Sequence, residues 1–396
     1  MIEFNSKYWI RKVGEKRMTS KYELSISLDY APDWKVSDAL REFAQNCYDG
    51  ELMDSENTAE IKYDSENEKV YFVNKKSILT RDSMLLGNSP KANDESTIGR
   101  HGEGYKLGIV VLHRNGKNVT INNYEANEIW TTKVVDSRRF QSKIIRIDIE
   151  KKLFPMYENG LIIEVSGITS EEWEEFKGNT LKLQGEYEQI HTDDGDILLS
   201  PEHAGKLFVS GLYVASNKKF KYGYNFLPSR IKLDRDRRII DSFDCSWEAS
   251  SIWLSVNDSK YYGMIYELLS SDGYLDASYI SSRSYTNSKV AEFVAKEFVK
   301  DYGDKAVPIS NESDRLKIAG SGVKGVIVSK ELRDLIQDKV MDKLEIVEYN
   351  DTLPEELKPI KDWYDSWKFA FSESCKEGFT IALYEAIKKL NGETTE

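Results

Sequence analysis

The chain has 396 residues, and its 55 Lys and Arg against 67 Asp and Glu give a formal net charge of −12. This length predicts roughly two or three domains, and the content of 40% hydrophobic and 12% aromatic residues excludes a disordered chain. The acidic balance argues against nucleic-acid binding by the whole surface, although a local basic groove is compatible with it. The three cysteines are far apart, which favours a reducing compartment over a disulfide framework and provides no zinc-ligand spacing.

The pattern of apolar residues predicts a cytoplasmic protein without membrane contact. The first 20 residues contain no apolar stretch long enough for a signal peptide. A membrane-spanning helix needs about 18 consecutive apolar residues, and no such run occurs in the sequence.

The first half of the chain predicts a sheet with helices on one face. Residues 1–20 carry basic and aromatic side chains and are expected to form an arm. The expected elements then follow in order: strand 22–28, helix 36–50, strands 58–63 and 69–73, a long polar loop at 80–104, helix 105–113, and strands 117–123, 128–135, 142–149 and 160–166. This order predicts an α+β class with an antiparallel or mixed sheet.

The second half predicts two further blocks. We place the first domain at 21–195, because the acidic turn HTDDGD lies at its end. A β-containing second domain, 196–285, is expected to have strands at 206–214 and 220–226. A C-terminal α/β domain, 286–396, is expected to have helices at 288–302, 329–339 and 367–390 and strands near 305–309 and 324–328. Three aromatic residues are expected to pack a helix onto this domain, with a partner surface as the alternative: Trp363, Trp367 and Phe369.

The predicted helix 36–50 carries a polar stripe beside its apolar face. Glu42, Asn46 and Asp49 are spaced by four and three residues, so they fall on one stripe about 60° wide. A carboxylate, an amide and a second carboxylate at the rim of a core are suited to a pocket. The alternative is an ordinary solvated polar edge.

The stretch TIGRHGEGYKLG, residues 97–108, holds four glycines and leads into the predicted helix 105–113. Closely spaced glycines allow positive φ and close backbone approach, and a helix N-terminus presents unpaired N–H groups to an anion. Lys106 lies in the first turn and could reach a phosphate. No GK[ST] closes the stretch, which excludes a P-loop; a flexible surface loop is the alternative.

Together these two motifs resemble the GHKL superfamily, which includes DNA gyrase B subunits, MutL proteins, ninety-kilodalton heat-shock chaperones and histidine kinases. Its Glu-x-x-x-Asn-x-x-Asp helix is matched by Glu42, Asn46 and Asp49. Its Ile-Gly-x-x-Gly-x-Gly segment is matched by residues 98–104, at Ile98, Gly99, Gly102 and Gly104. The resemblance covers roughly residues 22–170 and implies an ATP-binding α/β sandwich with a lid, here residues 82–98.

The resemblance implies a role for each matched residue. Glu42 would activate the water that attacks the γ-phosphate, and Asn46 would be a ligand of Mg²⁺. Backbone N–H groups would hold the phosphates, with Gly102, Glu103, Gly104, Tyr105 and Lys106 as the residues around them.

Two positions depart from the family pattern. The adenine-reading Asp-x-Gly-x-Gly is replaced by a segment in which Asn74 is the candidate for the missing Asp, with capping of a turn as its alternative role. The late Gly-Thr would fall at Gly160-Leu161, which lacks the hydroxyl, and Asp49 could compensate on the base side.

Residues 221–238 hold six basic and two acidic side chains. In gyrase-like relatives a second domain supplies a Lys to the γ-phosphate, and Lys232 or Arg235 resembles it by placement. The alternatives are a self-paired charge cluster or a nucleic-acid contact with neighbouring aromatic residues for stacking.

The expected function is Mg²⁺-dependent ATP binding and hydrolysis that drives a conformational switch, with ATP-dependent homodimerisation through the arm. The alternative is a degenerate, non-hydrolysing module that acts on a protein or nucleic-acid partner.

Overall fold

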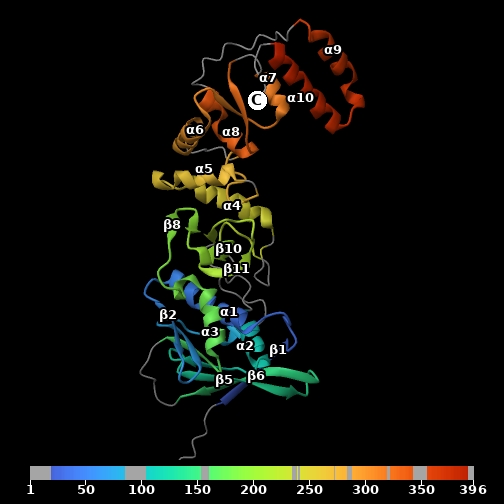
Figure 1. Ribbon diagram of the computed structural model, residues 1–396. Helices are drawn as coiled ribbons and strands as arrows, with labels where there is room; N and C mark the ends of the chain where they lie inside the picture. The colour runs from blue at the N-terminus through green and yellow to red at the C-terminus, as the bar shows by residue number, and fades with distance from the viewer. Residues whose placement is uncertain are drawn as a thin grey trace, which may run out of the picture. The chain divides into compact units, whose positions relative to one another are not determined.

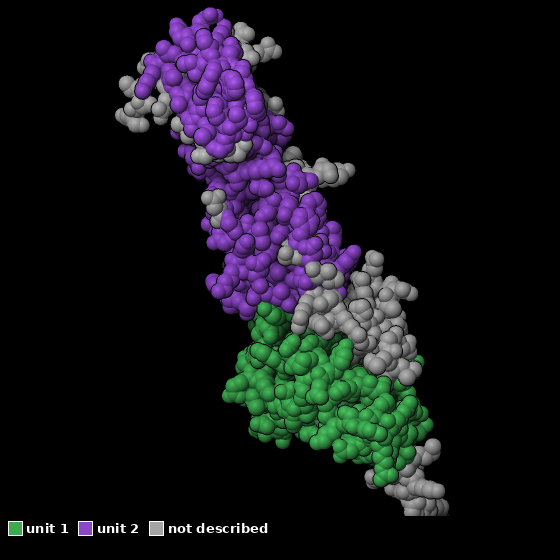
Figure 2. Space-filling view, turned by 90° about the vertical axis from the view of Figure 1, so that its right-hand side faces the viewer, with its two compact units in different colours: residues 1–186, 209–213 green, residues 187–208, 214–396 purple. Residues whose placement is uncertain are grey.

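The computed structural model describes residues 19–84, 104–152, 160–233, 239, 241–271, 273–282, 288–318, 322–341 and 355–390. The chain divides into two compact units (Figure 2). The first comprises residues 1–186 and 209–213, and the second comprises 187–208 and 214–396. The predicted arm, residues 1–20, lies outside the described residues except for its last two.

The first unit is built on a seven-stranded sheet in the order β1-β6-β5-β4-β7-β3-β2. Every neighbouring pair is antiparallel. The strands are β1 (Thr19–Ser27), β2 (Ala59–Asp64), β3 (Lys69–Asn74), β4 (Asn118–Asn123), β5 (Glu128–Ser137), β6 (Ser142–Lys151) and β7 (Leu161–Ser166).

Three helices cover one face of this sheet (Figure 1). They are α1 (Val36–Met53), α2 (Gly104–Arg114) and α3 (Ser170–Gly178), and the short 3-10 turn η1 (Arg81–Met84) follows β3. Alternation along β3 places Val70, Phe72 and Asn74 on the buried side. The apolar residues of α1 meet that side, with the Phe43 and Phe72 ring centroids 5.6 Å apart. Asn74 therefore faces α1.

A five-stranded sheet in the order β11-β10-β12-β9-β8 belongs mainly to the second unit, although residues 209–213, at the end of β10 and the start of β11, are counted with the first. Its strands are β8 (Gln189–Thr192), β9 (Gly195–Leu198), β10 (Lys206–Val209), β11 (Leu212–Ser216) and β12 (Gly223–Phe226). The acidic turn near residue 195 connects β8 and β9 as a hairpin. Sequence patterns did not predict these two strands, nor α4 (Ser242–Leu254) and α5 (Tyr262–Ser270) that follow.

A parallel pair of strands forms the centre of the C-terminal part. β13 (Ala306–Ile309) pairs with β14 (Lys324–Ile327). The helices around it are α6 (Ser288–Tyr302), α7 (Glu312–Lys317) and α8 (Lys330–Met341), followed by α9 (Lys358–Trp367) and α10 (Glu373–Leu390).

The predicted packing role of the three C-terminal aromatic residues is wrong. Trp363 and Trp367 are about half exposed, and Phe369 is 79% exposed. Tyr364 instead packs α9 on α10, with its ring stacked 3.9 Å from that of Phe379.

Both units contain helices as well as strands, so the predicted α+β class is confirmed. In the described parts of the chain, no helix has both the length and the apolar character to cross a membrane.

Candidate functional site

Glu42 lies in the middle of α1 and is 1% exposed. Its neighbour Arg41 places Nη2 at 3.8 Å from Glu42 Oε1. The Arg41 guanidinium is itself held by Asp38 at 3.5 Å and lies over the Trp34 ring. The helix therefore presents a carboxylate deep in the unit with a fixed opposite charge beside it, and the prediction of a position at the rim underestimates its burial.

Two glycines let α2 approach α1 closely. A Cβ on Gly104 would lie 2.4 Å from Glu42 Oε2 and 3.4 Å from Asn46 Nδ2. One turn later, a Cβ on Gly108 would lie 3.1 Å from Phe43 Cε1 and 3.2 Å from the Ala39 carbonyl oxygen. Glycine is required at Gly104 by this approach, not by its φ angle. The structure thus brings the predicted polar stripe of α1 against the start of α2.

The first turn of α2 directs its backbone N–H groups along the helix axis and away from the helix body, as at every helix N-terminus. Here they begin at Gly104, beside the carboxylate of Glu42, which complements the positive end of the helix dipole. Lys106 in the same turn has a buried side chain, at 1% exposure. A helix N-terminus of this kind can bind an anion. In this structure the nearest anionic group is the Glu42 carboxylate.

Asn46 stands one turn beyond Glu42 and is half-buried. Its Nδ2 donates to the Glu42 carbonyl oxygen at 2.7 Å, which fixes the amide and leaves Oδ1 as the oxygen available to a cation. No group of three or more His, Cys, Asp or Glu in the described part of the chain is arranged to hold a metal. A cation here would therefore take Asn46 Oδ1 together with ligand and water oxygens.

Asp49 is buried at 1% exposure near the end of the same stripe. The Tyr105 side chain of α2 lies close to it and against the Phe43 ring, with centroids 5.9 Å apart. Burial, with added repulsion from Cys47 and Asp49, raises the pKa of Tyr105. Tyr105 therefore stays a neutral phenol between the two helices.

Asn74 ends β3 and faces the C-terminal half of α1. Its Nδ2 donates to the Cys47 carbonyl oxygen at 2.9 Å, and the side chain is 4% exposed. Gly160 packs on the same strand end. A glycine is required there, because its φ is +90° and a Cβ would lie 2.1 Å from the Asn74 carbonyl oxygen. Leu161, the first residue of β7, pairs with Asn74 on the neighbouring strand β3 and is buried. The structure thus gathers the positions predicted for base recognition.

Asn57 is one of two residues near this site that the sequence analysis did not single out. It donates from Nδ2 to the Gly50 carbonyl oxygen at 3.1 Å and to Ser77 Oγ at 2.8 Å, and it accepts at Oδ1 from the Lys76 N–H at 2.9 Å. It therefore ties the segment after β3 to the end of α1. An Asn just beyond a helix is usual, so the sequence carried no signal for this role. Arg41 was also missed, although its place beside Glu42 was a signal.

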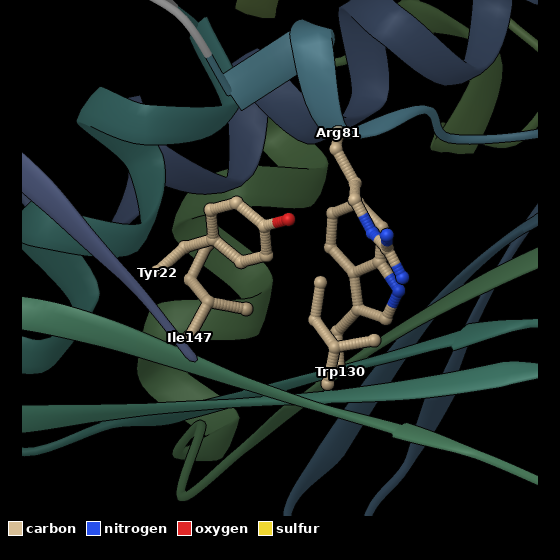
Figure 3. A pocket seen from close by; sticks show the side chains of 5 residues that line it. Tyr22, Arg81, Trp130 and Ile147 are labelled. Carbon is tan, nitrogen blue, oxygen red and sulfur yellow. The ribbon is translucent and has the colours of Figure 1, made fainter. Parts of the chain in front are cut away.

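The turn η1 is anchored to the sheet by Arg81. Arg81 Nη2 donates to Glu128 Oε1 at 2.8 Å, and Trp130 Nε1 donates to the other oxygen of that carboxylate at 2.9 Å. Figure 3 shows Arg81 beside Trp130, with Tyr22 and Ile147 across a cavity of about 10 Å³. Such a volume is close to that of one water molecule. The cavity is therefore a packing feature that fixes the chain before residue 85, and no ligand site.

Several predicted residues fall outside these contacts. Ile98, Gly99, Gly102, Glu103 and Arg235 lie outside the described residues, as does most of the predicted lid, 82–98. Lys232 is exposed and belongs to the second unit, so its role at a γ-phosphate stays a prediction.

Comparisons with known proteins cover part of the chain. Residues 171–259 match the family model described as the Mycoplasma pneumoniae MPN635 N-terminal domain. An uncharacterized protein of Mycoplasma pneumoniae strain M129 is 25% identical over 211 residues, which is 51% of this chain and 83% of that protein. Neither description states an activity.

Proposed function

We propose that the first unit binds ATP with Mg²⁺ and hydrolyses it, and that this chemistry drives a conformational switch. The observation that carries the proposal is the pairing of Glu42 and Asn46 on α1 with the N-terminus of α2, brought together at Gly104. A carboxylate, an amide oxygen and the backbone N–H groups of a helix N-terminus are the set that a metal-bound triphosphate needs. The family resemblance of the same motifs supports the assignment.

Glu42 is proposed as the general base. Its carboxylate is buried and held in place by Arg41, so it has a fixed geometry for accepting a proton from a water molecule. Asn46 is proposed to bind Mg²⁺ through Oδ1, since this hard cation prefers oxygen ligands and keeps several waters. Mg²⁺ would supply neutralisation of the phosphate charge. The α2 N–H groups from Gly104 onward would hold phosphate oxygens.

Asn74 is proposed to read the base. Because its Nδ2 is engaged by the Cys47 carbonyl, its Oδ1 is the atom left for recognition. A carbonyl oxygen accepts from an amino group, as the Asp of the family does, and favours a base with an exocyclic amine such as adenine.

The assignment of Glu42 is tested by the conservative substitution Glu42→Gln. It keeps the shape of the side chain but removes the base, so ATP turnover is expected to fall at least 100-fold while nucleotide affinity changes little. Glu60→Gln on β2, an exposed site with the same charge change, is the matched control and should leave turnover unaltered. Equal rates for Glu42→Gln and wild type would remove Glu42 from the mechanism.

A second candidate is a non-hydrolysing module that acts on a protein or nucleic-acid partner. It is favoured by Asn74 in place of a carboxylate and by the buried apolar Leu161 in place of a hydroxyl. If this function is correct, the wild-type protein does not turn over ATP. The Glu42→Gln variant then binds nucleotide or the partner as the wild type does. Single-turnover measurements with radiolabelled ATP separate the two functions.

The switch is proposed to include nucleotide-dependent homodimerisation through residues 1–20, with Lys232 or Arg235 sensing the γ-phosphate. Sedimentation velocity with a non-hydrolysable ATP analogue tests the first part, and a monomer under saturating nucleotide would contradict it.

A further inference from the structure

A cavity of about 340 Å³ lies in the second unit beside the parallel pair of strands. Val307, Pro308 and Ile309 of β13 line one side of it, Asp314 and Ile318 contribute from α7 and the residue after it, and Arg333 and Gln337 contribute from α8. Both strands are followed directly by helices, and the Val328 N–H donates to the Ile309 carbonyl oxygen at 2.9 Å, which aligns the two strand ends. Crevices at the carboxyl ends of parallel strands are common ligand sites.

The helix faces that line the cavity carry opposite charges. Asp314 and Ile318 are one turn apart, as are Arg333 and Gln337, so each pair presents one face. Arg333 Nη1 lies 3.9 Å from Asp314 Oδ2, too far for a hydrogen bond. The remaining lining is apolar.

The Arg333 guanidinium retains donor capacity. A guanidinium has five N–H groups. Its Nη1 donates to Ser310 Oγ, while Nε and Nη2 donate to Asp334 Oδ1 at 2.8 and 2.5 Å, so the described residues accept from three of these groups. Its side chain is 26% exposed. The geometry is open to a further anionic acceptor.

We propose that this cavity binds a free apolar α-amino acid. The carboxylate of such a ligand would be held by Arg333, its ammonium group by Asp314, and its side chain by the apolar wall of β13 and Ile318. A zwitterion matches the two opposite charges with no net charge to bury, and a branched aliphatic side chain matches the apolar lining. This site lies in the second unit and does not depend on the proposed ATP chemistry.

Isothermal titration of the full chain tests this with three probes of one shape. L-leucine should bind saturably, while 3-methylbutanoate, which lacks the amine, and 3-methylbutylamine, which lacks the carboxylate, should bind at least tenfold more weakly. Absence of leucine binding, or equal affinity for leucine and either analogue, would overturn the proposal. These comparisons use the wild type, so they are independent of how well any variant folds.

Variants then locate the site. Arg333→Gln and Asp314→Asn should each weaken leucine binding at least tenfold, whereas Lys300→Gln, which breaks an exposed ion pair with Glu297 on α6, should leave it unchanged. Glu42→Gln should also leave it unchanged, which separates this site from the proposed ATP site. Leucine affinity unaltered in both cavity variants would contradict the assignment.

Discussion

At the residue scale, Asn57 shows how one buried amide can position a site. Its three hydrogen bonds join the end of α1 to the segment after β3, and its side chain is 5% exposed. Asn57→Ala should lower the free energy of unfolding by about 2–4 kcal/mol, because it removes three hydrogen bonds of a buried amide, each worth about 0.5–1.5 kcal/mol net. Urea denaturation measures this. Asn67→Ala, in an exposed turn where the side chain bonds Asp64, is the control and should change stability little; equal losses would refute the role given to Asn57.

At the element scale, the close crossing of α1 and α2 depends on the absence of a side chain at Gly108. Gly108→Ala should destabilise the first unit by about 1–3 kcal/mol through overpacking against Phe43 and Ala39. Higher helix propensity would offset up to about 1 kcal/mol of that loss. Gly178→Ala at the end of α3 has open space around it and should leave the thermal midpoint unchanged or raise it. A Gly108→Ala protein as stable as the wild type would show that the helices can separate without cost.

At the scale of the whole molecule, each unit contains a histidine that links its stability to pH. Burial lowers the pKa of His113, which contacts Thr132 in the first unit, and that of His203 in the second. The unfolded chain takes up a proton near its ordinary pKa of about 6.5, but the folded chain resists it, so both units should lose stability as the pH falls below about 6.5. Thermal unfolding of His113→Gln and His203→Gln at pH 7.5 and 5.5 checks this. Each substitution should reduce the pH dependence of its own unit only, and an unchanged dependence in both would contradict the assignment.

The sequence predicted the first unit well because its signals are local. Helical spacing in α1 predicted that Glu42 and Asn46 share one stripe, and strand alternation fixes which residues of β3 face the core. The grouping of Asn74 with them was implied by the family resemblance. The hairpin around Gly195 was missed because a polar turn can indicate either a hairpin or a domain boundary. Helices α4 and α5 were missed as well. Asn57 and the cavity beside Arg333 could not be predicted, since both depend on contacts between residues far apart in the chain. Trp363 and Trp367 misled because an aromatic side chain on a helix usually packs.

The most direct test of the central claim is calorimetric titration of the full chain with a non-hydrolysable ATP analogue, with and without Mg²⁺. The geometry of α1 and α2 predicts one saturable site that needs Mg²⁺ and that weakens at least tenfold in Asn46→Leu, because the amide oxygen for the cation is lost. An absence of binding at millimolar analogue, or binding indifferent to both Mg²⁺ and Asn46, would contradict it.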